Sequence, residues 1–142
     1  MRSIVLLFGL SFLCLSMYPQ QIYFGYPTSK DEIKKGDKII LDIPIHNDGR
    51  FIPEKGIDRL IEFLNIESGF IFRIEIHFFY GSDEFAENYS RYICKNLKLH
   101  LLSECKFSNY DLYSCGKTHP IFLNKDSVSY QEMNTRMEIL VE

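Results

Sequence analysis

Residues 70–78 read Phe70-Ile71-Phe72-Arg73-Ile74-Glu75-Ile76-His77-Phe78, and residues 80–82 continue with Tyr-Gly-Ser. Every second residue from Phe70 to Phe78 is apolar, and a β-strand turns alternate side chains to the same face. The intervening residues Arg73, Glu75 and His77 are polar. The stretch therefore predicts a strand with one buried face and one polar face, in a sheet that is covered on one side.

A helix is predicted to begin directly after this strand. Ser82 offers a side-chain oxygen to the free amides of a first helical turn, and Asp83 and Glu84 place negative charge where the helix dipole favours it. Apolar residues then recur every four positions, which predicts a long amphipathic helix to about residue 104. These positions are Phe85, Tyr89, Ile93, Leu97 and Leu101.

The other segments give the remaining elements of the fold. Residues 38–46 alternate as a strand would, the spacing of Ile57, Leu60, Ile61 and Leu64 predicts a helix that starts near Pro53, and residues 110–115 and 136–141 predict two further strands. The resulting order is β-α-β-α-β-β. It predicts an α+β fold, a two-layer sandwich with two helices packed on one face of a small mixed sheet.

The N-terminal segment resembles an export signal. Arg2 precedes an apolar run from Ile4 to Leu15, which is too short for a membrane-spanning helix of about 20 residues. We therefore expect a signal peptide at residues 1–16, an extended lead-in at residues 17–37 and one folded domain at residues 38–142. A buried N-terminal strand or helix is the alternative, and acylation of Cys14 is disfavoured by the bulky residues before it. The mature chain is expected to contain no transmembrane segment.

Composition and motif spacing exclude several functional classes. The net charge of -3 is small and both signs are mixed, so nothing points to nucleic acid. No nucleophile, acid and base can be assembled into a catalytic group, the histidines lack partners at ligand spacing, and we expect no enzyme, cofactor or metal. Cys105 and Cys115 could close a short loop in an oxidising compartment, which leaves Cys94 as a buried thiol; whether this disulfide forms stays open.

Four segments, in the right order, resemble the OmpA-like C-terminal domain family. Residues 51–60 look like the family's entry into its first helix, Gly81-Ser82-Asp83-Glu84-Phe85 resembles its Gly-Ser-x-x-Tyr, and Tyr89-Ser90 stands where Leu-Ser is usual. Residues 134–139 are close to its terminal Asn-Arg-Arg-Val-Glu-Ile. The resemblance covers residues 38–142, and it implies a non-catalytic module of the bacterial cell envelope that is associated with peptidoglycan.

The resemblance also implies a ligand. The family holds the diaminopimelate of the peptidoglycan stem peptide with the Asp of a Gly-His-Thr-Asp turn and the Arg of Leu-Ser-x-x-Arg-Ala, because an ammonium and a carboxylate need an anion and a fork of donors. This chain has His77-Phe78-Phe79-Tyr80 in place of the turn and Ile93-Cys94 in place of Arg-Ala. Arg136 matches an arginine of the terminal motif, but an ordinary surface ion pair, with Glu138 or with charges of the helices, is the favoured interpretation.

Two hypotheses follow from the lost charges. In the first, the chain still binds peptidoglycan through a rearranged pocket; in the second, it is a degenerate OmpA-like scaffold that binds an envelope protein. Phe79 and Tyr80 would then present an aromatic surface at the strand end. Either way we expect an exported protein in the periplasm or at the outer membrane, with candidate ligand-binding residues Phe79, Tyr80, Gly81, Ser82 and Arg136.

Overall fold

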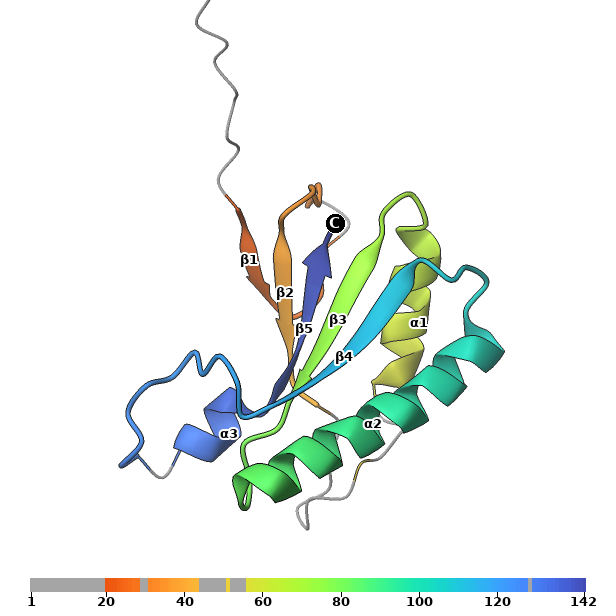
Figure 1. Ribbon diagram of the computed structural model, residues 1–142. Helices are drawn as coiled ribbons and strands as arrows, with labels where there is room; N and C mark the ends of the chain where they lie inside the picture. The colour runs from red at the N-terminus through yellow and green to blue at the C-terminus, as the bar shows by residue number, and fades with distance from the viewer. Residues whose placement is uncertain (1–19, 29–30, 44–50, 52–55, 128) are drawn as a thin grey trace, which may run out of the picture.

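The computed structural model describes residues 20–28, 31–43, 51, 56–127 and 129–142 (Figure 1). They form one five-stranded mixed sheet with two long helices and a third short helix, which confirms the predicted α+β fold class. The predicted order is present, with one strand and one helix added. The elements are β1 (Ile22–Phe24), β2 (Lys38–Leu41), α1 (Ile57–Ile66), β3 (Phe72–His77), α2 (Asp83–Glu104), β4 (Tyr110–Gly116), α3 (Tyr130–Asn134) and β5 (Arg136–Val141).

The last strand of the chain lies in the middle of the sheet. The strand order is β1-β2-β5-β3-β4, with β5 antiparallel to both of its neighbours and the pairs β1–β2 and β3–β4 parallel. Helix α2 is the crossover between the parallel strands β3 and β4, as a parallel pair requires. Because His77 at the end of β3 pairs with Arg136 at the start of β5, residues distant in sequence meet at this end of the sheet.

The predicted lead-in contributes a strand. Ile22–Phe24 pair in parallel with Lys38–Ile40, so this part of residues 17–37 belongs to the sheet. The turn between them is held by Asp37, a buried residue whose carboxylate accepts from the amides of Gln21 at 3.0 Å and Lys34 at 2.9 Å. Strand β1 is held in place partly by these hydrogen bonds to Asp37, which leave no alternation of apolar and polar residues in the sequence. The strand was therefore not predicted.

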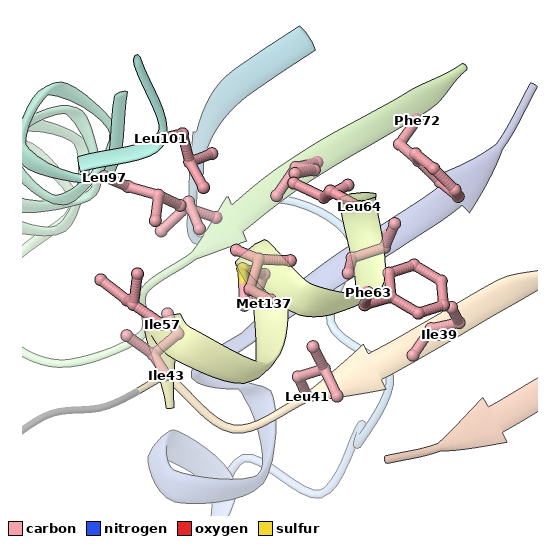
Figure 2. Close-up of a cluster of buried hydrophobic side chains, with 14 of the residues drawn as sticks. Ile39, Leu41, Ile43, Ile57, Phe63, Leu64, Phe72, Leu97, Leu101 and Met137 are labelled. Carbon is pink, nitrogen blue, oxygen red and sulfur yellow. The ribbon is translucent and has the colours of Figure 1, made fainter. Parts of the chain in front are cut away.

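The face of the sheet that the helices cover is apolar, as the alternation predicted. Side chains of the strands and of both long helices form one core cluster (Figure 2). Pro53 and Ile45 lie outside the described residues, but Ile57, Leu60 and Leu64 of α1 are buried as predicted. The strands contribute Ile39, Leu41, Phe72, Ile74, Ile76, Met137, Ile139 and Val141.

Helix α2 begins at the predicted cap but turns a different stripe inward at its first two turns. The Ser82 hydroxyl oxygen accepts from the Phe85 amide at 3.1 Å, which confirms the cap. Phe85 is half exposed, whereas Ala86 and Ser90 are buried, because a spacing of four drifts around a helix of 3.6 residues per turn. The small residue Ser90 lets β4 approach, and its hydroxyl accepts from the Gly116 amide at 3.2 Å. Within the described part of the chain, no helix has the length and apolarity to cross a membrane.

Candidate functional site

The structure brings the predicted site residues together at the end of the sheet where β3 leads into α2. Phe79, Tyr80, Gly81 and Ser82 form this connection, and Arg136 lies beside it because β5 begins there. The Phe79 amide donates to the Thr135 hydroxyl at 3.0 Å, which joins the two segments. The grouping is therefore as expected, but the environment of its members is not.

Arg136 is a buried residue and not part of a surface ion pair. Its side chain is 2% exposed, and its guanidinium contacts Glu138 at 2.5 and 2.7 Å. The remaining contacts go to the backbone carbonyls of Asn134 at 2.9 Å and His119 at 2.7 Å. Glu138 is one of the two kinds of partner that the sequence allowed, whereas the predicted surface exposure is wrong, because the segment between β4 and β5 covers this end of the sheet. All three guanidinium nitrogens already donate to acceptors within the protein, so Arg136 has little capacity left to bind a ligand.

The predicted aromatic surface is not present at Phe79. This side chain is 1% exposed and packs edge-on against Tyr130 of α3, with ring centroids 5.8 Å apart. Tyr80 is half-buried and packs on Phe78 at 5.5 Å. The expectation that Phe79 and Tyr80 form an exposed patch is therefore corrected, since helix α3, which the residue pattern did not predict, covers Phe79.

Gly81 and Ser82 have clear structural roles in the turn. Gly81 has φ +72°, and a Cβ there would lie 2.7 Å from the Phe85 ring, so the position suits only glycine. Its carbonyl accepts from the Lys117 ammonium, which also lies 3.2 Å from the Asp83 carboxylate. These contacts fix the entry to α2, and the whole turn is tied to the residues that follow β4.

The three described cysteines are free, so the bridge between Cys105 and Cys115 that the sequence left open is not formed. Cys105 follows α2, whereas Cys115 lies near the far end of β4, so the strand separates them. Burial raises the pKa of the Cys94 thiol to about 12 and that of Cys115 to about 11. The Glu75 carboxylate beside Cys115 raises its pKa further, so both thiols are protonated at neutral pH.

The polar face of β3 is partly buried, contrary to the expectation of a solvated face. His77 is fully buried, with Nδ1 2.9 Å from the Thr118 carbonyl and Nε2 3.3 Å from a Glu75 carboxylate oxygen. Burial and the neighbouring Arg136 charge lower the pKa of His77, which favours the neutral ring. Next to it, Glu138 is held between Arg136 and the Lys38 ammonium, the latter at 2.6 Å.

A cavity of about 260 Å³ lies on the helix-covered side, between β2, the start of α1 and the middle of α2. Ile93 of α2 is one of its apolar lining residues. Two charged residues also line it: Asp42 directly after β2 and Arg59 in the first turn of α1. The other lining residues are Gly25, Tyr26, Leu41, Ile43, Phe51, Gly56, Ile57, Leu60, Ile76, Leu97 and Met137.

The charged groups of this cavity are available to a ligand. Asp42 and Arg59 are both exposed, and no ion pair joins either of them to another residue of the described segments. The Arg59 guanidinium lies 5.4 Å from the centre of the Tyr26 ring, a cation–π contact that orients it. The N-cap of α1 is Gly56, which has no side chain that could accept from the backbone amides of the first turn. These amides are therefore further hydrogen-bond donors beside Arg59.

Sequence reasoning did not identify Asp42 and Arg59 as a site. Asp42 stands on the polar side of an alternating strand and Arg59 in the polar part of an amphipathic helix, positions that are usually solvated. Only the packing of α1 across the end of β2 brings the two residues to one cavity. Their signal in the sequence is weak, because 16 intervening positions separate them and no motif joins them.

Comparison with solved structures identifies the fold. Two crystal structures of the periplasmic domain of Helicobacter pylori MotB are similar to this chain. The first has a TM-score of 0.53 at 18% identity and covers 79% of each chain; the second has 0.50 at 19% identity and covers 79% of this chain and 76% of the other. No protein-family model and no curated protein sequence matches. The chain therefore shares the fold of this periplasmic domain, which agrees with the α+β architecture predicted from the sequence.

Proposed function

We propose that this chain is a non-catalytic domain of the bacterial cell envelope that binds the peptidoglycan stem peptide in the cavity between β2 and α1. The observation that carries the proposal is the lining of that cavity, where one carboxylate and one guanidinium stand at the edge of an apolar pocket. The OmpA-like fold, shared with a periplasmic domain, supports the envelope assignment.

The cavity suits a ligand with an ammonium and a carboxylate on a short aliphatic chain, such as diaminopimelate. Asp42 would accept from the ammonium, and Arg59 with the first amides of α1 would donate to the carboxylate. The methylene groups would pack on Ile93, Leu97 and Met137, which line the same space. This arrangement needs neither the Asp nor the Arg that the family usually provides.

The family's own recognition pair is not part of this proposal. Ile93 replaces its arginine, and the segment that replaces its Gly-His-Thr-Asp turn is largely buried, with His77 and Phe79 almost inaccessible. Wall binding would therefore depend on Asp42 and Arg59 alone for charge recognition. Export, with residues 1–16 as a signal peptide that lies outside the described residues, remains part of the proposal.

The test is retention of the purified protein by insoluble peptidoglycan sacculi, with free diaminopimelate as competitor. We expect retention that diaminopimelate abolishes, and a loss of affinity of roughly tenfold or more in Asp42→Asn and Arg59→Gln, the size of a charge-assisted hydrogen bond. Asp58→Asn and Arg91→Gln are matched controls, because both residues are exposed and neither lines the cavity. Absence of retention, or equal loss in the controls, would contradict the proposal.

A second candidate is a protein-binding envelope scaffold, and the edge of the sheet favours it. Among the strands that the structure describes, β1 pairs with β2 alone, and it exposes Phe24 (81%) and Ile22 (52%). An exposed apolar edge strand is a template for pairing with another chain. If sacculi do not retain the protein while Phe24→Asp removes a specific protein from a pull-down of envelope extract, this candidate replaces the first.

A further inference from the structure

Three potential metal ligands meet on the face of the sheet opposite the long helices. Glu75 and His77 are two residues apart on β3, so their side chains share this face. Cys115 comes from the neighbouring strand β4, at the point where the register with β3 shifts between Ile76 and His77. One carboxylate oxygen, one imidazole nitrogen and the sulfur all lie within 4.8 Å of one another.

In the neutral ring of His77, the nitrogen Nε2 has no hydrogen-bond donor to face its lone pair. The Thr118 carbonyl can only accept, so Nδ1, at 2.9 Å, carries the proton in the neutral ring. Nε2 then points a lone pair at the Glu75 Oε2 atom, 3.3 Å away, which is also an acceptor. A neutral histidine satisfies only one of these two contacts. A cation between Nε2 and Oε2 satisfies both.

Hydrogen bonds also orient the Glu75 carboxylate toward His77. Its Oε1 atom accepts from Arg73 Nε at 2.7 Å, and the Arg73 guanidinium lies 4.3 Å from the centre of the Tyr113 ring. These contacts orient the carboxylate and leave Oε2 to face His77. The carbonyl of Thr118 acts on His77 in the same manner, since a hydrogen bond to the second ring nitrogen fixes the tautomer of a metal-binding histidine.

We propose that Glu75 Oε2, His77 Nε2 and Cys115 Sγ bind Zn²⁺. One oxygen, one nitrogen and one sulfur suit this borderline-soft ion, and the carboxylate and the thiolate together neutralise its charge. Binding releases the Cys115 thiol proton to solvent as the Zn–S bond forms. Bond lengths of 2.0–2.3 Å place tetrahedral ligands about 3.5 Å apart. The His77–Glu75 pair is already close to this separation, at 3.3 Å, and Cys115 Sγ lies within 4.8 Å of both ligand atoms.

The fourth position faces the segment after β4. His119 is exposed, and its ring centre lies 6.5 Å from that of His77. Its backbone is fixed with φ 54°, and its carbonyl accepts from buried Arg136. Water or the His119 ring completes the coordination. The proposed zinc site is separate from the cavity on the helix-covered face, so it does not rest on the proposed function.

The experiment is titration of the reduced protein with Co²⁺ and Zn²⁺ alone. We expect one Co²⁺ per chain, visible d–d bands and a near-ultraviolet thiolate-to-cobalt band, all displaced by Zn²⁺. Cys115→Ser should remove the thiolate band, whereas Cys105→Ser, which removes another half-buried thiol, should keep it. No stoichiometric binding by the wild type, or a thiolate band that survives Cys115→Ser, would overturn the proposal.

A second pair of measurements covers the variants that fold poorly. Glu75→Gln keeps the shape of a partly exposed side chain, and we expect it to weaken Zn²⁺ binding by roughly tenfold to a hundredfold. Zn²⁺ should raise the melting temperature of the wild type and of Cys105→Ser, but not that of Cys115→Ser. If Zn²⁺ stabilises Cys115→Ser as much as the wild type, the thiol is no ligand and the proposal fails. Repeating the cobalt titration with His119→Ala assigns the fourth position.

Discussion

The two faces of the sheet are held by different kinds of interaction. On one face, strands and helices bury an almost purely apolar cluster. On the other face, Arg136, Glu138 and His77 are buried near the end of β3 and the start of β5. The connection between β4 and β5 contacts His77 and Arg136 there. The first face is stable because water is excluded from apolar surface. The second is stable because its buried charges, Arg136 and Glu138, are paired with each other. The loss of a single group should therefore have different consequences on the two faces.

The largest expected effect is in the apolar face. Phe72 of β3 is fully buried, and the centre of its ring lies 5.3 Å from that of Phe63 of α1. We expect Phe72→Ala to lower the free energy of unfolding by about 4 kcal/mol, because the lost transfer energy and the cavity add. Urea denaturation followed by circular dichroism measures it. A cost below about 1 kcal/mol, the range of exposed positions, would show that this face is not the core.

Removing one charge of the ionic face comes next. Glu138→Gln leaves Arg136 buried without its anion, and we expect a loss of about 3 kcal/mol by denaturation. The informative control is the double variant Arg136→Met with Glu138→Met. It should cost less than the single substitution, since an apolar pair leaves no uncompensated charge. If the single and the double variant are equally unstable, packing and not charge pairing holds this face.

Acid should weaken the ionic face selectively. Burial raises the pKa of Glu138, but the Lys38 and Arg136 contacts outweigh it and hold that pKa below its ordinary value of 4.5. A depressed folded-state pKa gives stability that is present above the unfolded pKa and is lost as the pH falls through the folded value. We therefore expect unfolding free energy to fall below about pH 4.5, and less so in the Met–Met double variant. A parallel fall in both proteins would assign the acid sensitivity elsewhere.

The smallest expected effect is at the entry to α2, between the two faces. Ser82→Ala removes the acceptor of the Phe85 amide, and helix caps of this kind contribute about 1 kcal/mol. Ser82→Asp should keep the stability, because a carboxylate also caps. Thermal unfolding of the two variants compares them directly. Equal destabilisation by Ala and Asp would mean that the cap does not hold this turn.

The contrast between the faces also explains what could be predicted from the sequence. Alternation in residues 70–78 and 136–141 and helical spacing from Ile57 to Leu64 predicted the fold class and the core. These signals are local and periodic. The burial of Phe79 and Arg136 was not predicted, because α3 covers the first and the segment after Gly116 covers the second. These covering segments are polar, and their residues show no regular spacing of apolar side chains.

The same limit applies to the candidate sites. Asp42 with Arg59, and Glu75 with His77 and Cys115, are brought together by strand order and by the crossing of α1, which short motifs do not encode. Glu75 and His77 are adjacent on one face of a strand, but the third donor, Cys115, comes from another strand.

We propose that the cavity between β2 and α1 recognises the wall peptide. The most direct measurement is an NMR titration of the ¹⁵N-labelled protein with diaminopimelate. We predict saturable shifts at the amides of Asp42, Gly56, Ile57 and Arg59, and their loss in Arg59→Gln. Shifts confined to Gly81, Ser82 and Asp83, or no shifts at all, would contradict the account and would move the search to the turn before α2 or to protein partners at β1.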